Sequence, residues 1–200
     1  MNFQRLNILA IGLVLVLLPA ITLGFVPWWS LIILFVVYSV ILGWGVFDIG
    51  SQFFMKTYWK GKPGKIAITF DDGPHPEYTP RVLDVLREAN VKATFFCTGE
   101  NASANPLLLK EMVEAGHVVG NHTQKHAYVF NKAAARRQLT EGQDSIAEVI
   151  GKKPRYFRPP FGVMTPEIAS VVKENGSVVV GWDLRSRDGT THSKQAIVNR

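Results

Sequence analysis

Charge is absent from a long stretch near the N-terminus. No Asp, Glu, Lys or Arg occurs between Arg5 and Asp48, which leaves 42 uncharged residues at positions 6–47. An uncharged run above about 18 residues is typical of a membrane-spanning helix, so the sequence argues against a purely soluble protein. Cysteine is nearly absent too, because Cys97 is alone, and this excludes an internal disulfide framework. Internal repeats and low-complexity segments are also lacking.

The uncharged stretch is long enough to cross a bilayer twice. As one helix it would extend roughly 63 Å, about twice a hydrocarbon core of ~30 Å. Pro27 is followed by two tryptophans, at a point where a helix should break and where indoles favour the membrane interface. The sequence therefore predicts a membrane anchor over residues 1–50, with helices near 6–26 and 31–47. A cleaved signal sequence is the alternative.

Aromatic residues and lysines are interleaved directly after this anchor. We interpret residues 51–64 as a juxtamembrane linker that contacts lipid headgroups, which makes the lipid bilayer an expected partner. The residues concerned are Phe53, Phe54, Tyr58 and Trp59 with Lys56, Lys60, Lys62 and Lys65. Arg5 and Asp48 cancel, so the net charge of +6 belongs to the remainder of the chain. There the charges alternate in sign along helical stretches, which indicates solvated faces, and no nucleic acid is expected as a partner.

From Lys65 onward, short β-rich runs alternate with helical patterns. Helices are predicted over 81–90, 107–115 and 167–175, each after a Thr-Pro or Asn-Pro pair, and Gly116, Gly151 and Gly176 are expected to end helices. Strands are predicted over 66–70, 93–97, 117–120, 156–158 and 178–182. This alternation predicts an α/β fold with a parallel sheet, either doubly wound or a β/α barrel.

Ionisable side chains follow four of the five predicted strands, where ligands gather in such folds. These strand ends carry Asp71 and Asp72, then His122, then the run Arg158-Pro159-Pro160-Phe161-Gly162, and finally Asp183, Arg185 and Asp188.

Two histidines and two carboxylates suggest a metal site. His122 and His126 are four residues apart, so a helix or helical loop would place them on one face. Asp71 and Asp72 are adjacent in a strand and cannot both point the same way, so one could bind a metal while the other stays free as a base. Two histidines and one carboxylate suit zinc, and equally cobalt, nickel or iron. The remaining histidines are predicted to be structural or solvated: His75, His117 and His192.

Three motifs resemble those of a known family. Thr69-Phe70-Asp71-Asp72-Gly73-Pro74, His122-Thr123-Gln124-Lys125-His126 and Arg158-Pro159-Pro160-Phe161-Gly162 are similar, in order and spacing, to motifs of the polysaccharide deacetylases with a NodB homology domain, carbohydrate esterase family four. The resemblance covers residues 65–200. It implies a distorted (β/α) barrel that removes acetyl groups from sugars of a cell-envelope polysaccharide with a divalent metal, most often Zn²⁺ and otherwise Co²⁺ or Ni²⁺.

The resemblance also implies a role for each motif residue. It assigns Asp72, His122 and His126 as metal ligands, Asp71 as catalytic base and Arg158 as the arginine that orients this base. The peptide N–H of Phe161 matches a position that helps to hold the oxyanion, and Pro160 with Phe161 matches one wall of the substrate groove.

The last part of the chain departs from the family pattern. Where the family commonly shows Asp-x-x-Asp-Trp, this chain has Arg185 and Gly189 in place of the first Asp and the Trp, while Asp188 is retained. Asp188 matches the residue that supports a histidine acting as general acid. That histidine is missing, His192 does not replace it, and we expect it beyond Arg200. We therefore expect a longer protein, truncated here after about five strands, and an isolated segment 65–200 that binds metal poorly or is inactive.

Function and membrane topology each leave alternatives. The main prediction is a membrane-anchored, metal-dependent deacetylase of a polysaccharide or peptidoglycan-like substrate. The alternatives are a small-amide hydrolase on the same fold and a non-catalytic sugar-binding relative. Two crossings would return residue 65 to the side of the N-terminus, and Lys56, Lys60 and Lys62 favour the cytoplasm. A cell-envelope substrate requires the outer side of the plasma membrane instead.

Overall fold

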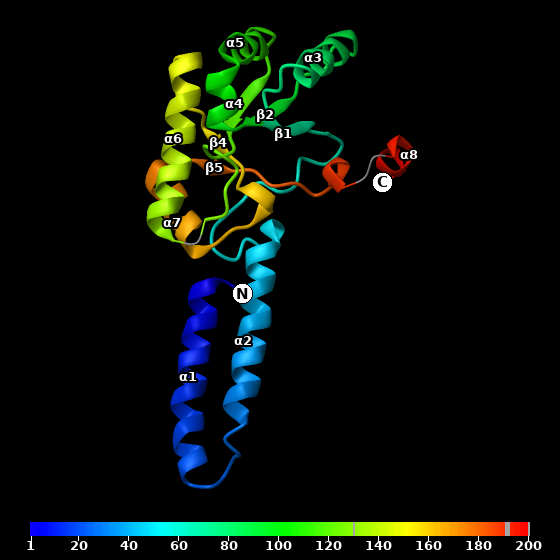
Figure 1. Ribbon diagram of the computed structural model, residues 1–200. Coiled ribbons are helices and arrows are strands. Elements are labelled where there is room, and N and C mark those ends of the chain that lie inside the picture. Colours follow the sequence, from blue (N-terminus) through cyan, green and yellow to red (C-terminus); the bar gives the residue numbers. More distant parts are fainter. Residues whose placement is uncertain (130, 191–192, 200) are drawn as a thin grey trace.

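An α/β domain stands on a hairpin of two helices in the computed structural model (Figure 1). The structure describes residues 1–129, 131–190 and 193–199. The first helix, α1, covers Phe3–Thr22, and the second, α2, covers Ser30–Phe47. Both are long and apolar enough to cross a membrane, with mean hydropathies of 2.1 and 2.4 over 18-residue windows.

The two helices differ from the prediction mainly at the ends of α1. This helix begins three residues early because the side chain of Asn2 accepts the N–H of Arg5 and caps it. It ends at Thr22 and not at residue 26, since Gly24 takes a left-handed conformation with φ of 78°. Pro27 lies in the turn between the helices, as predicted.

Five parallel strands form one sheet in the order β1-β2-β3-β4-β5. Their bounds are Thr69–Gly73, Thr94–Cys97, Val118–Asn121, Tyr156–Phe157 and Val178–Val179. Sequential order without a reversal is the winding of a β/α barrel, whereas a doubly wound sheet reverses its order at a switch point. In the part of the chain that the structure describes, the barrel-type alternative is therefore the correct one.

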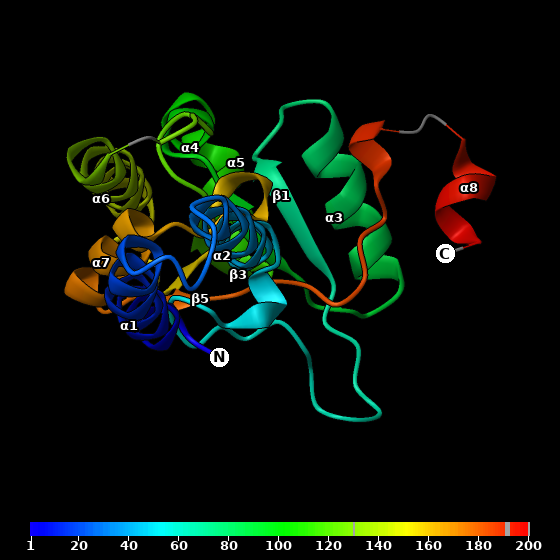
Figure 2. The ribbon, with the colours of Figure 1, turned by 90° about the horizontal axis from the view of Figure 1, so that it is seen from below.

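Helices connect these strands and cover the sheet. They are α3 (Tyr78–Glu88), α4 (Gly99–Ala104), α5 (Pro106–Glu114), α6 (Lys132–Ile150) and α7 (Pro166–Asn175). Seen along the hairpin, α6 and α7 lie on one side of α2 and α3 on the other (Figure 2). One apolar cluster, with Phe95 and Leu109, fills the space under α3 and α5, and a second, with Phe157 and Val171, lies under α6 and α7.

The predicted strand over 66–70 begins three residues too early. The strand β1 begins at Thr69, and the side chain of Ile66 is 94% exposed. Residues 66–68 are apolar enough for a strand, but the paired residues of β1 and β2 begin only at Thr69 opposite Thr94. The last two strands are also shorter than predicted.

The predicted juxtamembrane linker packs onto the domain. Phe53 is 2% exposed and contacts the rings of Phe3 and Trp44, so it does not face lipid headgroups as expected. Ile49 joins the apolar cluster under α7. Tyr58 pairs with Val180 as a further parallel bridge along the outer edge of β5. The end of α2 and the sheet are therefore continuous in packing.

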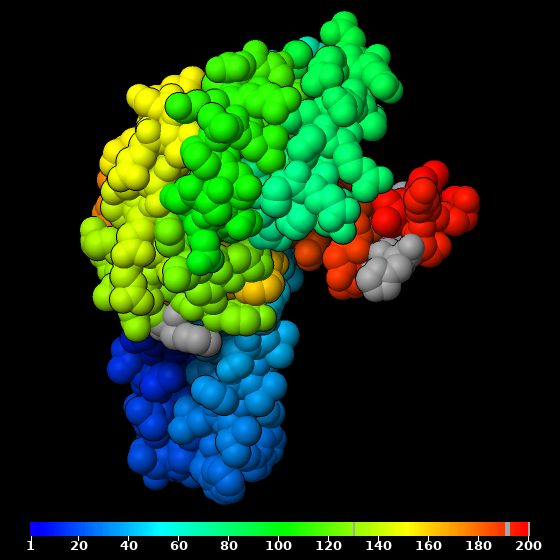
Figure 3. All heavy atoms as spheres, turned by 45° about the horizontal axis from the view of Figure 1, so that its top comes forward, coloured from blue at the N-terminus to red at the C-terminus, as the bar shows by residue number. Residues whose placement is uncertain are grey.

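A C-terminal segment extends away from the body (Figure 3). It contains a short 3-10 turn, η3 (Asp188–Thr190), and a helix, α8 (Lys194–Val198), neither of which has a buried residue. The helix α8 begins after Ser193, whose side chain accepts the N–H of Ala196 and caps it. His192 lies outside the described residues.

Candidate metal and catalytic site

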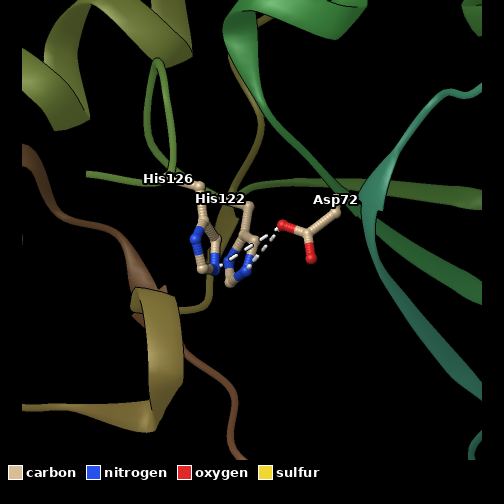
Figure 4. Close-up of side chains that lie close together, drawn as sticks. All are labelled: Asp72, His122 and His126. Atoms are coloured by element: carbon tan, nitrogen blue, oxygen red, sulfur yellow. Dashed lines mark ion pairs between the residues drawn. The ribbon is translucent and has the colours of Figure 1, made fainter. Parts of the chain in front are cut away.

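Side chains from the carboxyl ends of β1 and β3 converge on one point (Figure 4). Oδ1 of Asp72 lies 3.6 Å from Nε2 of His122 and 3.6 Å from Nε2 of His126. The three possible ligand atoms lie within 4.8 Å of one another. One carboxylate and two imidazoles at this separation match the donor set of a divalent metal with open positions.

The buried histidine is held in the form that a metal requires. Nδ1 of His122 lies 2.6 Å from the carbonyl oxygen of Arg158, which can only accept, so Nδ1 carries the proton and the Nε2 lone pair faces Asp72. Burial lowers the pKa of His122, while the charge of Asp71 and the hydrogen bond to the Arg158 carbonyl act in the opposite direction. A neutral imidazole with a fixed tautomer can bind a cation without first losing a proton.

A non-helical loop brings the second histidine into place. Residues 121–126 do not form the helix or helical loop that would place the two histidines on one face, because Thr123 and His126 have left-handed φ values of 70° and 51°. Side chains stabilise this path: Oδ1 of Asn121 accepts the N–H of Thr123, and the Thr123 hydroxyl accepts the N–H of His126. Gly142 of α6 lies against the loop, where a Cβ would come within 2.6 Å of the Thr123 backbone.

Asp71, the other carboxylate at the end of β1, pairs with an arginine. Oδ1 of Asp71 accepts a hydrogen bond of 2.7 Å from Arg158, whose side chain is only 2% exposed. The guanidinium also donates to the hydroxyl of Thr69 and to the carbonyls of Val180 and Gly181, at 2.8, 3.1 and 2.8 Å. Four acceptors therefore fix the arginine, and the arginine fixes one oxygen of Asp71.

Aromatic rings complete the environment of this arginine. Cζ of Arg158 lies 4.1 Å from the ring centre of Phe96 and 5.2 Å from that of Trp182. Burial lowers the pKa of Arg158 from its ordinary value, and the neighbouring charge of Asp71 opposes this shift.

The Pro160–Phe161 segment forms a wall beside the histidines. Phe161 has a left-handed φ of 60° and is 41% exposed, while Pro160 is buried. The ring of Phe161 contacts His126 edge-on at 4.5 Å and stacks on Tyr128 at 4.4 Å. The sequence did not single out Tyr128, and no motif or spacing marks it.

Asp188 lies on the exposed turn η3, and its carboxylate accepts a hydrogen bond from Ser186. Among the described residues no hydrogen bond or ion pair connects it to Asp71, Asp72 or the histidines. The prediction that Asp188 supports catalysis stays a prediction.

Two of the remaining histidines have structural partners, as predicted. Nδ1 of His117 accepts the N–H of Ala93, and Nδ1 of His75 accepts the N–H groups of Glu77 and Tyr78 at the start of α3. A further residue that the sequence did not reveal is Asn101, whose side chain donates to the backbone carbonyl of Asp72 at 2.6 Å.

Comparisons with known proteins find relatives of this chain in one family. The model of the polysaccharide deacetylase family matches residues 60–180. Two peptidoglycan-N-acetylglucosamine deacetylases of Bacillus cereus are similar: one is 39% identical over 138 residues (67% of this chain, 64% of that protein), the other 36% identical over 137 residues (68% and 50%). The chain thus spans about half to two thirds of these relatives. The solved structure of the Bc1960 peptidoglycan N-acetylglucosamine deacetylase superimposes with a TM-score of 0.68 at 35% identity, covering 72% of this chain and 69% of that one.

Proposed function

This chain belongs to the polysaccharide deacetylase family, and we propose that the full-length protein is a membrane-anchored hydrolase that removes acetyl groups from N-acetylated sugars of a cell-envelope polysaccharide. The observation that supports it best is the convergence of Asp72, His122 and His126 beside the Asp71–Arg158 ion pair. A stable fold alone does not require two such groups at one end of the sheet.

Asp72, His122 and His126 would hold the metal, which we propose is Zn²⁺, with Co²⁺ or Ni²⁺ as alternatives. When bound, such an ion polarises a carbonyl group and makes water more acidic. The fixed Nδ1–H of His122 keeps Nε2 available, so this ligand is preorganised.

Asp71 would act as the general base. Its Oδ1 is held by Arg158, and the side chain is 31% exposed, so the carboxylate can reach an attacking water and take its proton. Arg158 acts through Asp71: it is buried among four acceptors and orients the carboxylate. Phe161 and Pro160 would place the sugar against His126, and the Phe161 peptide N–H would stabilise the oxyanion.

The direct test is acetate release by the full-length protein in detergent micelles with zinc, on N-acetylated oligosaccharides and on peptidoglycan. Asp71→Asn keeps the shape of the side chain and should reduce kcat by about 100-fold or more, with the Kd for zinc unchanged. Release at the wild-type rate by this variant would contradict the assignment of the base. Release from small linear amides but not from saccharides would favour the small-amide hydrolase.

A non-catalytic sugar-binding protein is the second candidate. It is favoured by the position of Asp188, which pairs with Ser186 on an exposed turn, and by Gly189 in place of the family's Trp. Saccharide binding that is unaffected by Asp71→Asn, without acetate release, would support it.

We also propose that α1 and α2 cross the plasma membrane and that the domain lies on its outer side. The apolar length of both helices supports the crossing, and the expected substrate supports the outer side. Lys56, Lys60 and Lys62 favour the inner side. Reporter fusions after Trp59, active in one compartment only, decide between the two sides, and N-terminal sequencing of the mature protein tests the signal-sequence alternative.

A further inference from the structure

A hollow of about 590 Å³ lies where the end of the anchor meets the domain. Its lining includes two tryptophans, two arginines and two aspartates: Trp59, Trp182, Arg185, Arg187, Asp48 and Asp183. This volume is in the range of small-molecule sites. None of the six residues belongs to the proposed metal cluster.

Trp182 connects this hollow to the catalytic site. Its ring lies 5.2 Å from Cζ of Arg158, the arginine that holds Asp71. Its six-membered ring also lies so close to Gly162 that a Cβ there would come within 2.7 Å, and Gly162 directly follows Phe161. The Trp182 ring therefore lines the hollow and also contacts two residues beside the proposed catalytic groups.

The chemistry of the lining is mixed. Trp59 and Trp182 are half-buried and offer apolar ring surface, while the exposed Arg185 stacks on Trp182 at 4.6 Å and offers hydrogen-bond donors. Asp183 offers acceptors, and Asp48 has one oxygen engaged by the N–H of Gly50. Lys60 lies 5.9 Å from the Trp59 ring, so three cationic and two anionic side chains nearly balance.

A sugar residue has the complementary surface. One face of a pyranose ring consists of C–H groups, which gain free energy when they cover an indole, and its rim carries hydroxyls that both donate and accept. Because cationic and anionic side chains lie side by side, the lining favours a ligand whose groups both donate and accept over one with a single kind of charge. Anionic lipid headgroups fit less well, because the carboxylates of Asp48 and Asp183 would repel them.

We propose that this hollow is a subsite for a second, uncharged sugar residue of the glycan whose acetyl group is removed at the metal cluster. The identity of that glycan rests on the proposed function. The subsite makes the protein select oligosaccharides over single sugars, and it is built partly from the segment that joins the domain to the anchor.

The test measures the binding of an N-acetylchitohexaose to the whole chain in detergent micelles without added metal, by isothermal titration calorimetry. Trp59→Ala should raise the Kd for the hexasaccharide about tenfold, and Asp183→Asn, which keeps the side-chain shape, should raise it severalfold. Trp28→Ala is the matched control, because Trp28 lies between α1 and α2 and is 67% exposed. It should leave the Kd unchanged.

The Kd for zinc separates a local effect from a general loss of structure. It should be the same in Trp59→Ala and in the wild-type protein. Unchanged saccharide binding in Trp59→Ala, or an equal loss of saccharide and zinc binding, would overturn the subsite. Trp59-dependent binding without acetate release by the full-length protein with zinc would support the subsite and contradict the proposed deacetylation.

Discussion

Replacement of Arg158 by alanine should destabilise the domain strongly. The side chain is 2% exposed and donates four hydrogen bonds, one of them in the ion pair with Asp71. Arg158→Ala would leave buried carbonyls without their donor and open a cavity between the rings of Phe96 and Trp182. Breaking a buried ion pair in this way costs about 3–5 kcal/mol.

The expected shift in Tm follows from the size of the protein. For a chain of this length 1 kcal/mol corresponds to about 2–4 °C, so Arg158→Ala should lower Tm by about 6–20 °C. Asp71→Asn should cost less, about 1–3 kcal/mol, because the amide oxygen can still accept from Arg158 and the side chain is 31% exposed. Arg155→Ala is the matched control: this arginine is exposed, and its loss should change stability by less than ~0.5 kcal/mol.

The double variant completes the test. If Asp71 contributes to stability only through Arg158, Arg158→Ala with Asp71→Asn should unfold within ~0.5 kcal/mol of Arg158→Ala alone. Thermal unfolding of the solubilised protein, followed by tryptophan fluorescence, gives the change in stability of the two single variants, the double variant and the Arg155→Ala control relative to the wild-type protein. A loss below ~1 kcal/mol for Arg158→Ala, or strict additivity in the double variant, would refute this reasoning.

Three further predictions concern the loop, a buried histidine and the metal. Gly142→Ala should cost about 1–3 kcal/mol, because its Cβ would lie 2.6 Å from the backbone of the histidine loop, whereas Gly189→Ala, with open space around it, should be neutral in the same unfolding assay. Equal effects would contradict the tight contact. Burial lowers the pKa of His117 from 6.5, and Lys92 adds to this, so the unfolded chain takes up the proton first and the free energy of unfolding falls as the pH drops below ~6.5. Denaturant titrations from pH 8 to 5.5 should show a shallower fall for His117→Asn, and an unchanged slope would count against it. Zinc at about 100 times its Kd should add ~2.7 kcal/mol to the stability of the wild-type protein, reversibly with a chelator, and nothing to His126→Ala. A similar gain in that variant would place the zinc elsewhere.

The sequence predicted the elements that depend on local patterns. The uncharged run marked both α1 and α2, and proline after threonine or asparagine marked the starts of α5 and α7 to within one residue. Asp71 and Asp72 do have different partners, Arg158 and the two histidines. Regular strand alternation is not the reason, because Asp72 has a left-handed φ of 66° and the pairing of β1 with β2 is irregular between Asp71 and Gly73.

What the sequence could not reveal depends on contacts between distant residues. The path from Asn121 to His126 relies on left-handed residues and on a close approach of α6 at Gly142, neither of which a helical spacing of four predicts. The start of β1 is set by its pairing with β2, which begins at Thr69 opposite Thr94. The apolar residues before Thr69 therefore predicted the start of the strand too early. Phe53 is an aromatic residue next to lysines, as is typical of a membrane interface, but it is buried because it packs against the ring of Trp44, nine positions away.

Packing at the end of α2 bears on where a substrate must lie. The N–H of Met164 donates to the carbonyl of Val46 in the last turn of α2, at 3.0 Å, and Met164 is three residues from Phe161. Gly45 of α2 lies directly against the ring of Phe53, and Ile49 is part of the domain core. If α2 crosses the membrane as proposed, the wall formed by Phe161 is held close to the bilayer surface without a flexible tether. The protein would then act on glycan that comes to the membrane and would not reach out into the cell envelope for it.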